Sequence, residues 1–343
     1  ADAYVGLAQA QLRSFRFSKN ISFLKKMEGT VSRLVQVNSK HSLLSYLKGE
    51  LKLNQGEYND AAILLNESIQ INPNFVKAYT SLSLTYQKLF ALDKAEEILL
   101  LGYKIMPSNN LLLTNLGALQ YSQGNYNKAI DYFELLAQQA PNNFVAYLNV
   151  SACHYLSGNL KKAIAAAEKS LAIQPNADVY ANIGTYYFML RDYEQSVEAY
   201  EKMIALNDAD YINWGNLADA YRFADNDKYK VTFEQAITLA EQAIKLNPNN
   251  KMTIAHLAYY YANINNIEKS ELYVQKITKH DAGLEHFLIA AAYTRLNMKA
   301  AAIKYLTYAI KNNYSIAEIR SSPLLDELRT ELKYQQLINK KVN

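Results

Sequence analysis

The chain has 343 residues, half of them apolar, and a formal net charge of +4 with both signs interspersed. The apolar share is ample for a large core. The charge excludes the dense basic stripe of nucleic-acid binders, so we predict no nucleic-acid binding through this region. No stretch reaches the roughly 18 uninterrupted apolar residues of a membrane helix, so we predict no membrane span. One cysteine, Cys153, allows no internal disulfide.

The first 41 residues predict a helical hairpin of irregular form. Tyr4, Leu7 and Ala8 open its first helix, and residues 24–34 supply its second. The chain begins with Ala1 rather than Met, and no basic-then-apolar leader follows. We therefore expect this chain to belong to a longer protein with another part ahead of it.

Residues 42–315 follow a period close to 34 residues. Each block predicts two amphipathic helices separated by a turn, and in many blocks a proline ends the second helix. Such spacing is the signature of stacked repeats. The closing prolines of the early blocks are Pro73, Pro107, Pro141 and Pro175. The eight blocks, called repeats one to eight below, are residues 42–75, 76–109, 110–143, 144–176, 177–210, 211–250, 251–282 and 283–315.

Small residues recur where the two helices of a hairpin must meet. In repeat three these are Gly117 and Ala129, and Gly124 supplies the turn between the helices. One hairpin is too small to bury its own apolar face, so neighbouring hairpins must stack.

The sixth repeat is about six residues longer than the others, and the extra segment falls near residues 223–232. Because loops often carry function, a functional loop is one reading of this polar segment. We favour the other, a longer second helix with a solvated turn. Residues 316–343 then predict a C-terminal capping helix and tail, with Ser322 and Pro323 as a helix start.

The repeat pattern resembles the tetratricopeptide repeat (TPR). Its places carry a large residue at 4, Leu at 7, a small residue at 8, Tyr at 11, Ala at 20 and Pro at 32. Single repeats depart from it, with Gln120 and His154 at place 11. The resemblance implies an all-α fold: a right-handed superhelix (α-solenoid) of about eight TPR hairpins, with the degenerate hairpin at residues 1–41 and the cap at residues 316–343.

A narrower resemblance comes from the long sixth repeat and from residues 322–338. Both are similar to segments in the TPR regions of bacterial multi-domain signalling proteins that carry a kinase, a cyclase or a winged-helix domain. This resemblance implies the sensing or docking half of a regulator. The compartment would follow from the attached domain, and cytoplasm and periplasm both stay open.

Catalytic and metal-binding patterns are missing from the sequence. The five histidines are scattered, and no Gly-rich phosphate loop, nucleophile elbow or paired-Cys motif occurs. The tyrosines at places 4 and 11 are core by position. We therefore predict that these residues form no enzyme and hold no metal and no cofactor.

Residues that the repeat does not require give the candidate site. Place 6 lies on the concave side of the first helices, away from the packed face. Asparagine amides can hold an extended peptide backbone whatever its side chains are, and flat aromatics beside them add apolar contact. We predict a protein or peptide partner bound by Asn115, Asn149, Asn182 and Asn216 at place 6, with Tyr121, Tyr155, Phe188 and Arg222 at place 12.

Two alternatives stay open. Asparagine is common throughout this chain, and the column can instead cap or bridge helices within the stack. The repeats can also serve as a structural scaffold or homo-oligomer element. The lysine, asparagine and arginine pattern of TPR domains that clamp an acidic C-terminal tail is not present, so that ligand is not predicted.

Overall fold

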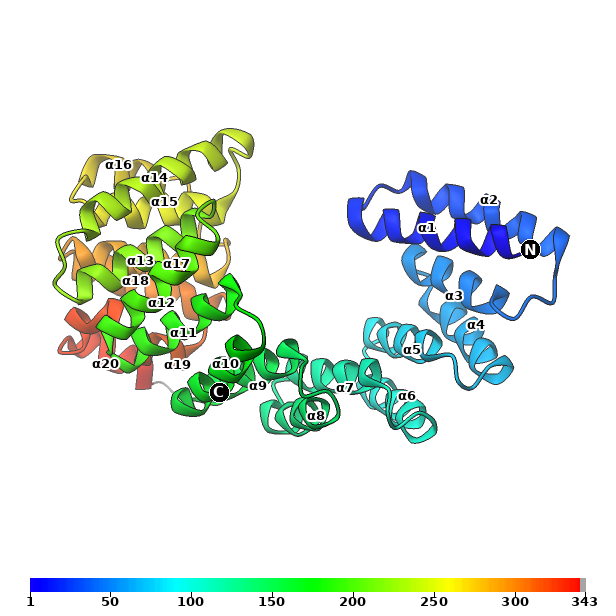
Figure 1. Cartoon of the computed structure of the whole chain (residues 1–343). Helices are drawn as coiled ribbons and strands as arrows, with labels where there is room; N and C mark the ends of the chain where they lie inside the picture. The colour runs from blue at the N-terminus through cyan, green and yellow to red at the C-terminus, as the bar shows by residue number, and fades with distance from the viewer. Residues whose placement is uncertain (340–343) are drawn as a thin grey trace. The chain divides into compact units, whose positions relative to one another are not determined.

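The computed structural model describes residues 1–339, which contain 20 α-helices and one 3-10 helix and no strand (Figure 1). The prediction of an all-α fold of stacked hairpins is confirmed. The chain divides into two compact units, Ala1–Ser157 and Gly158–Asn343, and the boundary falls at the turn inside repeat four. The predicted tail residues 340–343 lie outside the described residues.

The N-terminal unit is a row of helices in which each packs on its neighbours in sequence. Its core runs from Val5 to Leu119 without interruption. The helices are α1 (Asp2–Ser18), α2 (Ser22–Val37), α3 (Leu44–Gln55), α4 (Tyr58–Ile71), α5 (Val76–Lys88), α6 (Leu92–Ile105), α7 (Asn110–Ser122), α8 (Tyr126–Gln139) and α9 (Phe144–Leu156).

The second unit continues the same hairpins and ends in shorter elements. Its second helix of repeat six, α14, has 18 residues where α12 has 14. The extra residues of that repeat therefore lengthen a helix. The elements are α10 (Leu160–Ile173), α11 (Ala177–Leu190), α12 (Tyr193–Leu206), α13 (Tyr211–Phe223), α14 (Tyr229–Leu246), α15 (Lys251–Asn263), α16 (Ile267–Val274), α17 (Gly283–Arg295), α18 (Lys299–Lys311), α19 (Ile316–Ser321), η1 (Pro323–Leu328) and α20 (Leu332–Asn339).

Helix boundaries follow from two repeated local devices. Place 15 of every repeat has a positive φ, which closes the first helix with a left-handed residue. The first helices of repeats three to seven begin at a capping Asn or Asp whose side chain accepts a backbone N–H, as Asn109 does from Leu111 at 3.1 Å. The place-15 residues are Gly56, Phe90, Gly124, Gly158, Arg191, Asp225, Asn265 and Asn297.

The two helices of a hairpin approach closely where small residues face each other. At Gly117 an added Cβ would lie 2.5 Å from Cε1 of Phe133, so only glycine fits. A serine at place 8 or 20 also fastens several hairpins, since Ser83 Oγ donates to the carbonyl of Ala95 at 2.9 Å. The reversed bond occurs in repeat five, from Ser196 to Gly184 at 2.8 Å.

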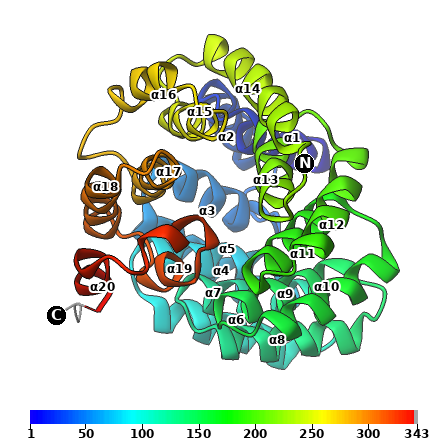
Figure 2. The same ribbon diagram turned by 90° about the vertical axis from the view of Figure 1, so that its left-hand side faces the viewer.

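The C-terminal segment folds back onto the second unit. α20 packs on α18 and on α19 (Figure 2), and η1 contacts α17. Ser322 caps η1 by accepting from Leu324 N, and Pro323 occupies its first turn. Leu325 and Leu328 are buried, so this segment completes the core at the end of the unit.

Candidate functional site

The asparagine column lies on four first helices. Asn115 is on α7, Asn149 on α9, Asn182 on α11 and Asn216 on α13, and all four side chains are half-buried. Asn115 Nδ2 donates to the carbonyl of Leu111 at 2.7 Å, one turn back in its own helix. Over residues 1–339 no intramolecular hydrogen bond engages the amides of the other three.

In the N-terminal unit the aromatic residues lie on the same helices as the amides. Tyr121 is 40% exposed on α7, and its ring meets Tyr126 edge-on at 5.8 Å. Tyr155 is half-buried on α9. Burial also raises the pKa of Tyr121, so its phenol stays protonated as a hydrogen-bond donor at neutral pH. α7 and α9 both pack on α8, which holds Asn115 and Asn149 on adjacent repeats.

In the second unit the place-12 residues are part of the packing. Phe188 makes edge contacts with Tyr193 at 5.5 Å and Phe223 at 5.1 Å, so it joins repeats five and six. α11 and α13 are in contact, which brings Asn182 and Asn216 onto neighbouring helices.

Arg222 is engaged by its own unit. Its Nη2 lies 3.4 Å from Oδ1 of the buried Asp219, and its guanidinium covers the ring of Phe223 at 4.3 Å. Tyr259 Oη donates to the same Asp219 oxygen at 2.5 Å. Burial raises the pKa of the Asp219 carboxyl, and these two partners oppose the rise. The arginine therefore serves a buried polar cluster.

The C-terminal segment covers this part of the second unit. A cavity of about 60 Å³ lies between residues of α13, α15 and α17 on one side and residues 323–327 on the other. Asp326 is bound by Arg191 from the end of α11, with Nη2 to Oδ1 at 2.8 Å, and by Arg329 at 2.7 Å. The first helices of repeats six to eight thus carry a segment of the same chain.

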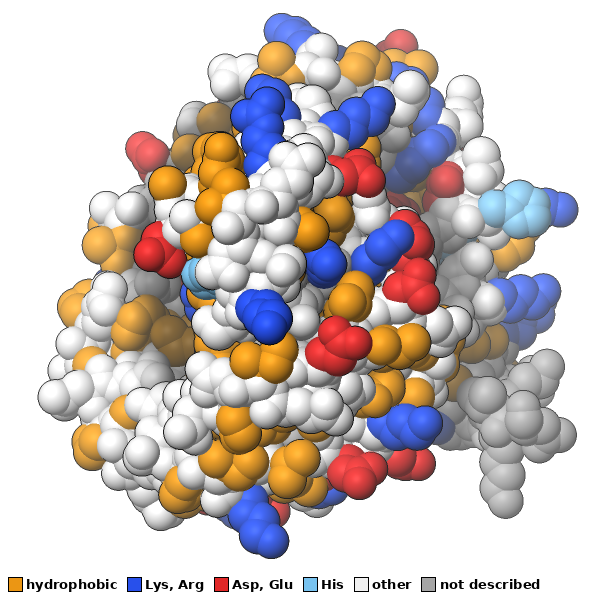
Figure 3. All heavy atoms as spheres, turned by 90° about the vertical axis from the view of Figure 1, so that its right-hand side faces the viewer, with side chains coloured by type: hydrophobic (Ala, Val, Ile, Leu, Met, Phe, Trp, Pro, Cys, Tyr) orange, Lys and Arg blue, Asp and Glu red, His pale blue; other side chains and the backbone are white. Residues whose placement is uncertain are grey.

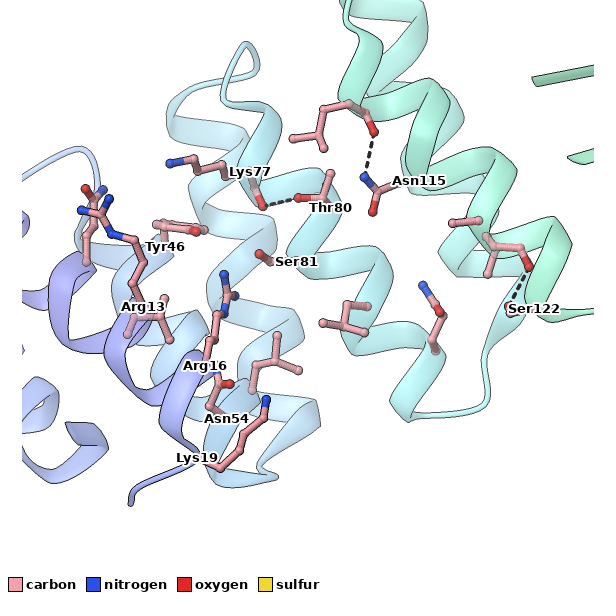
Figure 4. A pocket seen from close by; sticks show the side chains of 18 residues that line it. Arg13, Arg16, Lys19, Tyr46, Asn54, Lys77, Thr80, Ser81, Asn115 and Ser122 are labelled. Atoms are coloured by element: carbon pink, nitrogen blue, oxygen red, sulfur yellow. Dashed lines mark hydrogen bonds between the residues drawn. The ribbon is translucent and has the colours of Figure 1, made fainter. Parts of the chain in front are cut away.

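A larger pocket in the N-terminal unit was missed by the sequence reasoning. It has a volume of about 810 Å³ and is lined by residues of α1, α3, α5 and α7 together with Lys19. Figure 4 shows side chains of α1 pointing toward Tyr46 and Ser81. Its charged lining residues are all basic: Arg13, Arg16, Lys19 and Lys77.

One of these cations is neutralised by a buried acid. Arg16 Nη2 lies 2.6 Å from Oε2 of Glu50, which is fully buried on α3. Ser81 on α5 donates to the other carboxylate oxygen, and Asn54 donates to the backbone carbonyl of Glu50 at 2.7 Å. The remaining cations, Arg13, Lys19 and Lys77, form no ion pair within residues 1–339.

The single sign of charge in the pocket is not a general feature of the surface. On the face shown in Figure 3, acidic and basic side chains are both scattered among polar and apolar ones. The pocket instead gathers one sign, and a concave site lined by one sign of charge attracts the opposite charge. No signal in the repeat pattern points to it, because α1 lies in the degenerate hairpin outside the repeat register.

The part of the chain that the structure describes holds no group of three or more His, Cys, Asp or Glu residues placed to bind a metal ion. Cys153 is buried on α9, and burial raises the pKa of its thiol to about 11. None of the described helices is long and apolar enough to cross a membrane.

Comparison with protein families identifies the repeats. A tetratricopeptide repeat model matches residues 109–176, and a second one matches residues 177–210. Residues 109–210 therefore consist of tetratricopeptide repeats. TPR domains bind proteins or peptides, and a protein-interaction module is the class of function that this assignment supports. No curated protein sequence matches the chain.

Solved structures share the TPR fold at low sequence identity. A tetratricopeptide repeat protein from Parabacteroides merdae aligns with a TM-score of 0.54 and 18% identity, over 74% of this chain and 98% of that one. The C-terminal part of a TPR repeat-containing protein from Cytophaga hutchinsonii gives 0.52 and 17%, over 76% and 98%. A chain of the APC/C hetero-tetramer Cut9–Hcn1 gives 0.50 and 14%, over 84% and 52%. These likenesses concern the fold alone.

Proposed function

We propose that this TPR protein binds an extended segment of a partner protein along the first helices of repeats three to six. The observation that carries the proposal is the asparagine column. Asn149, Asn182 and Asn216 are half-buried, occupy the same place in successive repeats, and have no hydrogen-bond partner within residues 1–339. An amide in this situation has both donors and its acceptor available to a ligand backbone.

The neighbouring side chains support the same reading. Tyr121 and Tyr155 lie beside the column on α7 and α9, where rigid rings give contact area at low entropic cost. Phe188 packs on Phe223 of the next repeat and would hold the two first helices of the site together. Arg222 would lie at the border of the site, with its charge balanced by Asp219. Each amide hydrogen bond adds about 1 kcal/mol net, so affinity would come from several acting together.

The direct test is peptide-array binding by the intact chain and by the double variant Asn149→Ala with Asn182→Ala. We expect the variant to lose about tenfold or more in affinity for the peptides that the intact chain selects. Asn74→Ala with Asn142→Ala is the matched control, because both residues are exposed and lie in turns outside the column. Unchanged binding by the column variant would refute the proposal.

We further propose that the module is the docking part of a larger bacterial regulator. The resemblance of the lengthened sixth repeat to such proteins supports it. Co-purification of the full-length gene product with its partner, and loss of output when the column is changed, would test this role.

Self-assembly is the second candidate. Phe17 and Phe90 expose 94% and 92% of their surface in the N-terminal unit, and in this alternative their rings contact another copy of the chain. A concentration-independent monomer by light scattering would exclude it.

A further inference from the structure

The pocket of the N-terminal unit has the chemistry of a receptor for negative charge. Its volume of about 810 Å³ falls in the range of ligand-binding sites. Three of its cations, Arg13, Lys19 and Lys77, have no acidic partner within residues 1–339. The carboxylate of Glu50 accepts hydrogen bonds from two lining residues, Arg16 and Ser81, but Glu50 itself is fully buried. The pocket therefore presents a net positive charge.

The cations are arranged by secondary structure. Arg13, Arg16 and Lys19 follow one another at intervals of three residues, which places them on one side of α1 and its C-terminal cap. Lys77 lies at the start of α5, across the pocket (Figure 4). A ligand that meets all of them must extend over several ångströms, as a chain does and a single ion does not.

The rest of the lining favours a peptide. Leu84 on α5 and Leu111 on α7 expose 40% and 46% of their surface, so the lining offers apolar side chains as well as charges. Thr80 and Asn115 add hydroxyl and amide groups. Tyr46 is the only aromatic residue in the lining and is buried, with its ring edge-on to Phe75 at 4.8 Å, so it offers no platform for stacking a nucleotide base.

We propose that this pocket binds an acidic segment of the partner protein, one in which aspartate or glutamate alternates with apolar residues. The inference rests on the proposed function and names the chemistry of the partner at repeats one to three. Asn115 lines the pocket and is the first member of the asparagine column, so a bound chain could enter here and continue along the column.

The test is fluorescence anisotropy with the full chain and a labelled peptide of alternating aspartate and leucine. A peptide of alternating serine and leucine is the neutral comparison. We expect the acidic peptide to bind at least about tenfold more tightly and to weaken steeply with added salt. Equal binding of the two peptides would overturn the proposal.

Charge-reversal variants locate the site. Arg13→Glu with Lys77→Glu should weaken the acidic peptide about tenfold or more. Lys25→Glu with Arg33→Glu makes the same change in net charge on exposed residues of α2 outside the pocket, and should leave binding within about twofold. Equal losses in the two variants would show only general electrostatic attraction and would overturn the site. Circular dichroism of both variants checks that the helices persist.

Two further probes distinguish other anions. If a single-stranded oligothymidine binds more tightly than the peptide and loses binding in the pocket variant, the ligand is nucleic acid and the peptide proposal is wrong. If millimolar inorganic phosphate displaces the peptide, the pocket binds small anions in general and the proposal of a peptide site is wrong.

Failure of this inference is distinguishable from failure of the proposed function. If array peptides bind through Asn149 and Asn182 while the acidic probe does not, the pocket proposal alone is wrong. If no peptide of any composition binds, both are wrong. If the acidic probe needs Arg13 and Lys77 but not the two asparagines, the pocket stands and the column does not.

Discussion

Tyr261 donates its phenolic O–H to Oε1 of Glu241, 2.5 Å away, across the boundary between repeats six and seven. The tyrosine occupies place 11 of its repeat, and the glutamate projects from the second helix of the preceding one. Burial raises the pKa of Tyr261, and the Glu241 charge adds to the rise, so the phenol remains a donor. The same bond recurs from Tyr221 to Glu201 at 2.5 Å and from Tyr293 to Glu271 at 3.1 Å.

The Tyr261→Phe substitution should therefore destabilise the second unit by about 1 kcal/mol. It removes the hydrogen bond to a partly exposed carboxylate and the one that Lys269 Nζ donates to the phenol oxygen at 3.0 Å, and it removes little packing. Urea denaturation measures the change. Tyr180→Phe is the control, since its hydroxyl makes no hydrogen bond within residues 1–339, and its cost should be smaller. Equal costs would show that the phenol oxygen contributes nothing.

Glycine at position 117 is required by the close approach of α7 and α8. Gly117→Ala would place a methyl group 2.5 Å from the Phe133 ring and should destabilise the N-terminal unit by about 1–3 kcal/mol. Gly29→Ala on α2 meets nothing within 4 Å, so the same substitution should stabilise the unit by up to about 1 kcal/mol. Thermal denaturation of the two variants gives opposite signs if the packing account is right.

Phe90 is a large residue in a left-handed conformation, with φ of 56° and 92% of its surface exposed. Phe90→Gly should stabilise the chain by about 0.5–1 kcal/mol, because it relieves the steric cost of positive φ and loses almost no burial. Phe17 is equally exposed but lies inside α1, so Phe17→Gly should destabilise. Chemical denaturation measures the stability of both variants. A loss of stability in Phe90→Gly would contradict the claim that the positive φ of Phe90 destabilises the chain.

His256 makes the stability of the second unit depend on pH. It continues the place-6 column in repeat seven, where burial lowers its pKa below the ordinary value of 6.5. The folded state then holds it neutral, with Nδ1 2.9 Å from the carbonyl of Met252. Because the unfolded chain takes up a proton first, stability is complete above about pH 6.5 and declines as the pH falls below it.

The His256→Gln variant should lose less stability than the wild type between about pH 7 and pH 5. His280→Gln makes the same substitution at an exposed position and is the matched control. His286 shifts in the same direction through burial, so part of the slope remains in the variant. Urea midpoints at several pH values provide the measurement, and parallel curves for wild type and His256→Gln would exclude this histidine as a source.

Asp326 fixes the C-terminal segment to α11. Burial alone would raise its pKa, but Arg191 and Arg329 outweigh burial and lower it. The contact therefore persists above about pH 4 and is lost as the pH falls through the lowered folded pKa. Asp326→Asn should accelerate amide hydrogen exchange in residues 323–328 at neutral pH. Glu327→Gln, which removes an exposed charge that forms no ion pair within residues 1–339, should not. Equal exchange in both variants would rule out the anchor.

The repeat architecture was predictable because its determinants are local and periodic. Glycine, alanine and proline at fixed places specify where a hairpin turns, closes and ends, and Gly117 shows that one such residue reports a real contact. The pattern also predicted that the tyrosines at place 11 are core residues. It could not predict which residues accept the hydrogen bonds of their hydroxyls. The acceptor of Tyr261, Glu241, lies 20 residues earlier in the chain, on a helix face whose sequence pattern is that of a solvent-exposed face.

Contacts between segments that are far apart in the chain could not be predicted from the sequence. Arg191 and Asp326 form a hydrogen-bonded ion pair although 135 residues separate them in the sequence. The residues around each of them give no indication of the partner. The ion pair of Arg222 with Asp219, in which Nη2 lies 3.4 Å from Oδ1, was also not predicted. The basic pocket is lined jointly by α1, α3, α5 and α7, and α1 has no repeat register from which its inward face could be predicted.

Cys153 has a practical consequence for every binding experiment above. Its thiol is fully buried, and burial raises its pKa to about 11. Little thiolate therefore forms at neutral pH, and maleimide reagents should react with it slowly. A cysteine introduced at the rim of the basic pocket would then be the only reactive one among residues 1–339, and the wild-type chain already provides the unlabelled background. A fluorophore attached there would report occupancy directly, without removing any native residue first.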